Sequence, residues 1–148
     1  MVWDFENVMI EDLKYNQVTQ TIIGAAMKVH SKMKNRYVAA VYQKCMDIEL
    51  KKAGLEFQQE IDLPIYYDGV IVRRKRIDYI VDKKIILELK AITTLENNHL
   101  AQAINYLESH LLQIGLLLNF GGKSLQFKRL VNGQKTDALK NPVNPTYP

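Results

Sequence analysis

The sequence of 148 residues lacks the features of secreted and membrane proteins. Its single cysteine, Cys45, excludes an internal disulfide, and no neighbouring His or Cys has the spacing of a zinc site. No apolar run approaches the ~18 residues that a membrane span requires, and the first residues are acidic where a secretory leader would be basic. We therefore expect a cytoplasmic protein that does not contact membranes.

A strong charge of one sign is also missing. The chain has 20 Lys and Arg residues against 16 Asp and Glu residues, and the resulting net charge of +4 permits an anionic partner without demanding one. Proline is scarce, and three of the four prolines follow Asn132. We therefore predict one domain over residues 1–132 and an extended tail over residues 133–148.

What the sequence does contain is clear periodicity. Apolar residues at helical spacing predict helices over residues 17–33, 37–53 and 95–110. Alternating or continuous apolar runs predict strands over residues 57–67, 70–81, 85–90, 114–118 and 125–131, with a hairpin turn at Asp68-Gly69. Pro64 indicates that the first strand is at an edge or bends. The fold class is α/β, a mixed central sheet flanked by helices in the order α-α-β-β-β-α-β-β.

Two carboxylates are expected to meet across the second and third strands. Asp78 stands near the end of one strand and Glu88 near the end of the next, with a turn at residues 82–84 between them. Paired strands are only ~5 Å apart, so both side chains could reach one ion. Oxygen ligands suit Mg²⁺ or Mn²⁺, which could serve phosphodiester chemistry with Lys90 stabilising negative charge. The alternative is an ordinary ion-pair network joining these residues to Arg76.

Further candidates lie on the following helix and on the second strand. Gln102 and Tyr106 are four residues apart and share a helix face, where they could hold phosphate or water; the alternatives are a solvated face and a core aromatic. His99 is expected near the site but not as a ligand. Arg74 and Arg76 belong to a basic run that could bind a nucleic-acid backbone, or could simply protect an edge strand.

As an ordered set, these residues resemble the GxxExxY family of small PD-(D/E)xK proteins. The similarity spans roughly residues 18–131 and includes the segments Ile22-Ile23-Gly24-Ala25, Leu63-Pro64-Ile65-Tyr66-Tyr67-Asp68-Gly69, Arg76-Ile77-Asp78, Glu88-Leu89-Lys90-Ala91, Leu100-Ala101-Gln102-Ala103-Ile104-Asn105-Tyr106-Leu107, Gly115-Leu116-Leu117-Leu118-Asn119-Phe120-Gly121 and Phe127-Lys128-Arg129-Leu130. The resemblance implies a restriction-endonuclease-like core and a nuclease ancestry. It also implies that Asp78, Glu88 and Lys90 form the catalytic core, with Gln102 and Tyr106 as the Gln-x-x-x-Tyr motif of RecB-type exonucleases.

The motif that names this family is degenerate here. Counting back from Tyr42, Arg36 stands at the glycine position and Ala39 at the glutamate position, so a helical carboxylate expected to help bind metal is missing. Neither Asp47 nor Glu49 restores it, because each lies about 12 Å or more further along the same helix. We expect the Arg36 side chain instead to add positive charge near the site for binding nucleic acid.

Three functions follow as hypotheses. The first is a Mg²⁺- or Mn²⁺-dependent nuclease acting on DNA, with activity reduced by Ala39. The second is a catalytically inactive nuclease-fold protein that binds nucleic acid. The third is a protein-partner role, for example as a homodimer, for which the sequence offers no positive signal.

Overall fold

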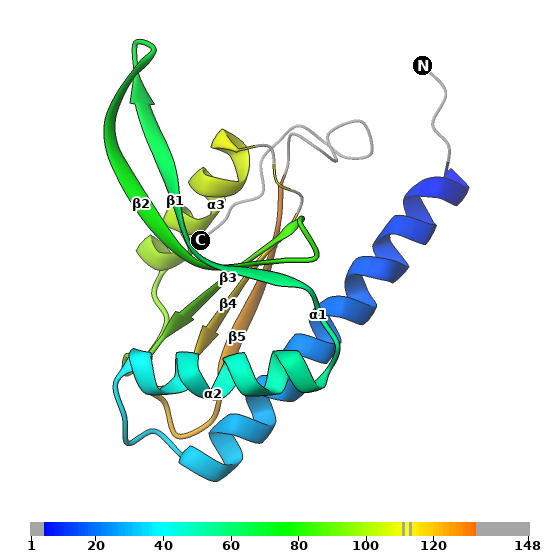
Figure 1. The fold of residues 1–148 in the computed structure, drawn as a ribbon, viewed down its shortest axis with the longest axis vertical. Coiled ribbons are helices and arrows are strands. Elements are labelled where there is room, and N and C mark those ends of the chain that lie inside the picture. The colour runs from blue at the N-terminus through cyan, green and yellow to red at the C-terminus, as the bar shows by residue number, and fades with distance from the viewer. Residues whose placement is uncertain (1–4, 111, 113, 133–148) are drawn as a thin grey trace.

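The computed structural model describes residues 5–110, 112 and 114–132 (Figure 1). Its elements are α1 (Phe5–Met33), α2 (Ala39–Lys52), β1 (Phe57–Tyr67), β2 (Val70–Val81), β3 (Ile85–Lys90), α3 (Asn97–Ser109), β4 (Ile114–Asn119) and β5 (Gln126–Val131). This order confirms the predicted α-α-β-β-β-α-β-β arrangement. The predicted tail, residues 133–148, lies outside the described residues. Within the described part of the chain, no helix is long and apolar enough to cross a membrane.

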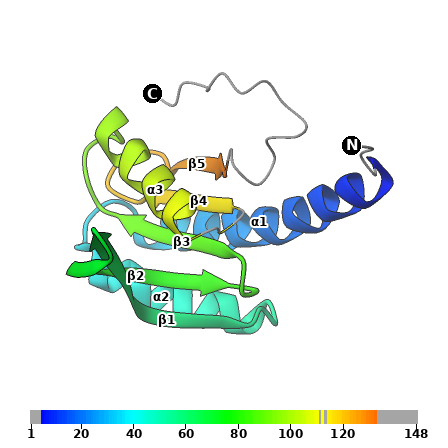
Figure 2. The same cartoon turned by 90° about the horizontal axis from the view of Figure 1, so that it is seen from above.

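The five strands form one mixed sheet in sequence order, side by side from β1 to β5 (Figure 2). Adjacent strands are antiparallel except β3 and β4, which are parallel because α3 carries the chain back between them. The strand with Pro64 is at the edge of the sheet, as its proline predicts.

Helices cover both faces of the sheet. Residues of α1 and α2, among them Ile22, Tyr42 and Met46, form one core with Leu87 and Leu89 of β3. The second core lies on the opposite face, where α3 packs against Ile86. Since β3 is buried on both faces from Ile85 to Leu89, its continuous apolar run is explained.

The turns form at residues with positive φ that the sequence identifies, whereas the helix starts were predicted less well. Asp68 and Gly69 both have positive φ, at 49° and 76°, which is the conformation that a two-residue hairpin turn requires. Gly54, with φ of 75°, ends α2 as a C′ glycine. The predicted starts were less accurate, because α1 begins at Phe5 rather than Gln17 and α2 at Ala39 rather than Tyr37.

The hairpin of β1 and β2 projects beyond the rest of the sheet (Figure 1). The two strands pair from Phe57–Val81 to Tyr67–Val70, whereas β2 pairs with β3 only from Tyr79–Leu87 to Val81–Ile85. We call the projecting part, residues 61–77, the hairpin arm. It leaves the sheet next to Asp78.

The loop between β3 and α3 is held by a buried asparagine at the end of β4. The Asn119 side chain accepts a hydrogen bond from the Ile92 N–H and donates one to the Ile92 carbonyl, each at 2.9 Å. Gly121 follows closely, and a Cβ atom there would lie 2.2 Å from the same Ile92 oxygen. A glycine is therefore needed at this position to let two backbone segments approach.

We expect Gly121→Ala to lower the free energy of unfolding by about 3 kcal/mol, since backbone atoms fixed by Asn119 cannot move away from the new methyl group. Urea denaturation followed by circular dichroism measures this. The matched control is Gly24→Ala in α1, where a Cβ meets no heavy atom within 4 Å and helix propensity favours alanine. Equal stability of both variants would contradict the expectation.

Candidate active site

Asp78 lies at the fork where β2 separates from β3. Its Oδ2 atom accepts a hydrogen bond of 2.8 Å from the Leu89 N–H, so a side chain replaces the main-chain acceptor that the ladder no longer provides. The β1–β2 register also omits Asp78 and the facing Glu60, which has a positive φ of 52°. This irregularity lets Ile77 pack in the α3 core while Tyr79 packs in the opposite one.

Glu88 points to the α3 side of β3, whereas its neighbours Leu87 and Leu89 point into the α1–α2 core. The alternation therefore runs as the sequence predicted. Only 8% of Glu88 is exposed, and its Oε1 atom has no hydrogen-bond partner among the described residues. A buried carboxylate oxygen without a partner is costly and is typical of a site that receives a ligand.

The two carboxyl groups disturb each other's ionisation. Burial and the negative charge of Asp78 raise the pKa of Glu88 to about 7, against the opposing positive charges of Lys75 and Lys90. Burial also raises the pKa of Asp78 above its ordinary value, although the hydrogen bond from Leu89 opposes this. A cation between them would relieve both effects.

Lys75 is a site residue that the sequence reasoning missed. It is half-buried and lines the same narrow cleft as Glu88 and Lys90. The signal was present, because alternation in β2 places Lys75 on the opposite strand face from Arg74 and Arg76. The prediction instead treated the basic run as a surface for a nucleic-acid backbone or as protection of an edge strand.

Helix α3 forms the other wall of this cleft with His99, Gln102 and Tyr106. Gln102 is exposed and Tyr106 is half-buried, and the structure brings both to the same cleft as Glu88. His99 has a structural role as well, since its Nδ1 atom accepts a hydrogen bond from the Glu96 N–H in the capping box that starts α3.

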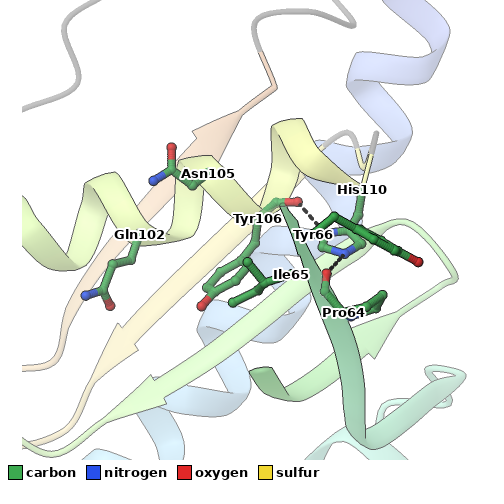
Figure 3. Close-up of a pocket in the computed structure, with 7 residues that line it drawn as sticks. All are labelled: Pro64, Ile65, Tyr66, Gln102, Asn105, Tyr106 and His110. Atoms are coloured by element: carbon green, nitrogen blue, oxygen red, sulfur yellow. Dashed lines mark hydrogen bonds between the residues drawn. The ribbon is translucent and has the colours of Figure 1, made fainter. Parts of the chain in front are cut away.

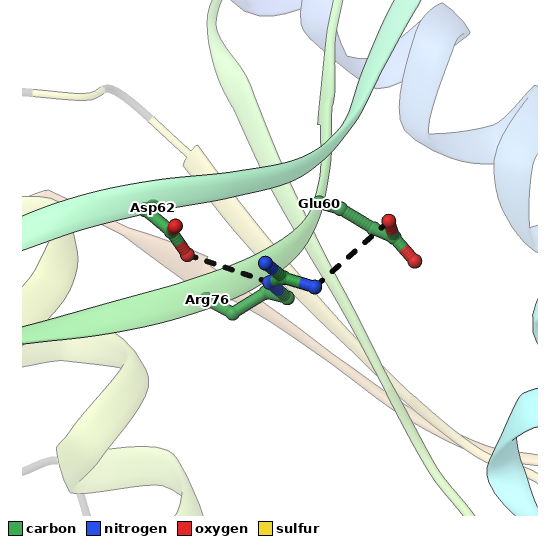
Figure 4. A network of polar contacts seen from close by, with 3 residues as sticks. All are labelled: Glu60, Asp62 and Arg76. Carbon is green, nitrogen blue, oxygen red and sulfur yellow. Dashed lines mark hydrogen bonds and ion pairs between the residues drawn. The ribbon is translucent and has the colours of Figure 1, made fainter.

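The predicted nucleic-acid-binding arginines are all exposed, but they differ in their contacts. Arg36 lies in the turn before α2, and Arg74 lies on the hairpin arm. The Arg76 guanidinium is 3.4 Å from Asp62 and 4.0 Å from Glu60, both on β1 (Figure 4). Among the described residues, neither Asp78 nor Glu88 forms an ion pair with a lysine or arginine, so the alternative network with Arg76 is not formed.

The acidic residues of α2 do not complete the site. Asp47 accepts hydrogen bonds from the Tyr79 hydroxyl and the Gln59 amide, and Glu49 pairs with Lys28 at 3.1 Å. No group of three His, Cys, Asp or Glu side chains that could hold a metal occurs in the described ranges. The carboxylates that the structure places together here are those of Asp78 and Glu88.

This pair fits a divalent ion whose other ligands are water or substrate. Both groups offer carboxylate oxygens, one of them the unpartnered Oε1 of Glu88. Ala39, where the resemblance noted in the sequence implies a further carboxylate, is the first residue of α2. The first turn of α2 lies close to the site edge, since Tyr42 stacks on Phe120 at 4.6 Å and the Phe120 N–H bonds to the Lys90 carbonyl.

The fold and the paired carboxylates define a restriction-endonuclease-like protein. The model of the PD-(D/E)XK nuclease superfamily matches residues 16–130. The chain belongs to that superfamily, whose nucleases generally use divalent metal ions and act on nucleic acid.

Other comparisons are more distant. No protein of curated function matches the chain significantly. The crystal structure of SSO0001 is similar with 18% sequence identity and a TM-score of 0.47, over 70% of this chain and 60% of that one. This chain therefore spans less than two thirds of that protein's length.

Proposed function

We propose that the protein is a Mg²⁺- or Mn²⁺-dependent nuclease that hydrolyses phosphodiester bonds of DNA. The observation that carries this proposal is the buried Glu88, which lines a cleft with Lys75 and Lys90 and is repelled by the negative charge of the half-buried Asp78. Such a pair is unfavourable without a cation, so its presence at a cleft indicates a binding role.

Each residue has a role that suits its chemistry. Asp78 and Glu88 would hold the ion, and the bound ion would polarise the phosphate and ease deprotonation of water. Lys90 and Lys75 supply positive charge next to Glu88, where charge develops on phosphorus. Gln102 and Tyr106 would position the phosphate from α3, while Arg36, Arg74 and Arg76 would bind the nucleic-acid backbone.

We further propose that the chain is a GxxExxY-type member of the superfamily with a weakened metal site. Ala39 leaves two carboxylates, so metal affinity and activity at low Mg²⁺ concentration are reduced. The domain would end near residue 132, because the Asn132 side chain still donates hydrogen bonds to the Leu107 and Leu112 carbonyls at 2.9 and 2.8 Å.

The second candidate function is a catalytically inactive nuclease fold that binds nucleic acid or a protein partner. The absence of a third acidic ligand among the described residues favours it. The two candidates differ in one measurable property, which is whether the natural site cleaves DNA when divalent metal is supplied.

The test compares the natural protein with Ala39→Glu on labelled single- and double-stranded DNA over a Mg²⁺ and Mn²⁺ series. We expect the natural protein to cut at high metal concentration and Ala39→Glu to cut at about tenfold lower concentration, since one more carboxylate joins the site. The matched control is Ala40→Glu, because Ala40 is the exposed neighbour of Ala39. Cleavage by Ala39→Glu alone would favour the inactive-fold candidate, and cleavage by neither would reject the nuclease.

A further inference from the structure

Two cavities between the hairpin arm and α3 share Gln102 and Tyr106 in their lining. The first, of about 540 Å³, is lined by Pro64, Ile65 and Tyr66 of the arm and by Asn105, Tyr106 and His110 on the helix side (Figure 3). We call it the aromatic cavity. The second, of about 470 Å³, is lined by Arg73, Arg74, Lys75 and Arg76 of the arm. We call it the basic cavity.

The aromatic cavity has a fixed wall and an exposed aromatic side chain. The two ring nitrogens of His110 lie 3.1 Å from the Tyr106 carbonyl oxygen and 3.2 Å from the Pro64 carbonyl oxygen (Figure 3). The histidine thus joins the arm to α3 and sets the separation of the two walls. Tyr66 remains 60% exposed at the cavity, which leaves its ring available for stacking.

The chemistry of the aromatic cavity suits a nucleobase. Its volume is within the range of small-molecule sites, and its lining combines aromatic rings with the side-chain amides of Gln102 and Asn105. Such amides both donate and accept hydrogen bonds, as the edge of a base requires. A base inside a duplex is stacked and paired, so only an unpaired nucleotide could enter.

The basic cavity provides for the phosphates on either side of such a base. Tyr106 and Gln102 line both cavities, and Lys75 lines both the basic cavity and the cleft of Glu88. A strand with one base in the aromatic cavity would therefore pass its backbone over Arg73 and Lys75, which share a strand face, toward the carboxylates. Positive grooves next to aromatic rings are the usual means of binding single strands.

We propose that the substrate is single-stranded nucleic acid, held by insertion of one unpaired base between Tyr66 and α3. This inference rests on the proposed nuclease function insofar as it calls the bound strand a substrate. The binding step itself does not depend on cleavage, so the two can be tested separately.

The test measures binding in EDTA, which prevents metal-dependent cleavage. Fluorescence anisotropy is recorded with a labelled oligothymidylate, with its duplex, and with a strand of equal length that carries abasic sites. We expect the single strand to bind about tenfold more tightly than the duplex or the abasic strand. Tyr66→Ala should weaken binding of the single strand about tenfold and leave the abasic strand unchanged, while Tyr66→Phe should bind like the natural protein.

The matched control is Tyr67→Ala. Tyr67 is the next residue of the arm, is 70% exposed and does not line the aromatic cavity, so its loss should leave binding unchanged. Arg73→Ala should weaken all three ligands alike, because Arg73 lines the basic cavity on the strand face of Lys75 and acts on the phosphates. Circular dichroism verifies that each variant is folded.

The possible outcomes separate this inference from the proposed function. Equal affinity for duplex and single strand, or no effect of Tyr66→Ala, would overturn the single-strand inference even if the protein cleaves DNA. Conversely, preference for single strands that depends on Tyr66, without cleavage in Mg²⁺ or Mn²⁺ by either the natural protein or Ala39→Glu, would uphold the inference and reject the nuclease.

Discussion

Asp78→Asn is expected to reduce DNA cleavage by on the order of a thousandfold at saturating Mg²⁺. An asparagine retains the oxygen that accepts the Leu89 hydrogen bond, so the strand fork is preserved. It removes a negative charge from a pair of ligands that has no third member among the described residues. If the bound ion stabilises the transition state by several kcal/mol, losing that stabilisation slows cleavage by about a thousandfold. The initial rate of cleavage of a labelled strand measures it.

The control for Asp78→Asn is Glu56→Gln. The Glu56→Gln variant also loses one carboxylate charge, but Glu56 is exposed and lies before β1. Cleavage by Glu56→Gln should equal that of the natural protein, and binding of DNA in EDTA should persist in both variants. If Asp78→Asn cleaves as fast as the natural protein, the activity belongs to another site or to a contaminant.

Glu88→Gln is expected to stabilise the metal-free protein at pH 8 by about 3 kcal/mol. Burial beside Asp78 raises the pKa of Glu88 from 4.5 to about 7, so the folded state holds this proton more tightly than the unfolded state. Stability from this group is therefore complete below about pH 4.5, declines as the pH rises to about 7, and stays low above that. The difference between the folded and unfolded pKa of Glu88 corresponds to about 3 kcal/mol in the free energy of unfolding, at about 1.4 kcal/mol per pKa unit.

Urea denaturation in EDTA at pH 4.5 and pH 8 tests this expectation. The variant and the natural protein should have similar stability at pH 4.5 and differ at pH 8. Saturating Mg²⁺ should reduce the difference, because the ion stabilises only the ionised pair. Glu49→Gln is the opposite control, since Lys28 lowers the pKa of Glu49 and that variant should lose stability at pH 8. A pH-independent difference for Glu88→Gln would contradict the assigned cause.

Much of the fold follows from local sequence periodicity. The change from helical to alternating spacing located β1 from Phe57 to Tyr67, and the apolar run of β3 indicated burial on both faces. The early start of α1 at Phe5 was missed, although Phe5, Met9 and Leu13 also recur at helical spacing in the sequence.

The candidate site was partly accessible from sequence. Asp78 and Glu88 could be paired because a short hairpin joins their strands, and this required no long-range information. Alternation separates Lys75 from Arg74 and Arg76, but which face points inward could not be read from Tyr79, because the β1–β2 register is interrupted at Glu60 and Asp78. The cavities against α3 depend on how that helix packs on the sheet, which periodicity does not determine.

The fork at Asp78 also has a mechanical consequence. The β2–β3 ladder covers only Tyr79 to Val81, and beyond it the hairpin arm is held by the Asp78–Leu89 hydrogen bond, by Ile77 in the α3 core and by the contact between His110 and the Pro64 carbonyl. Displacing the arm would therefore break these side-chain contacts while leaving the short backbone ladder intact. Because one of these contacts belongs to Asp78, we expect any displacement of the arm to move a carboxylate of the candidate site.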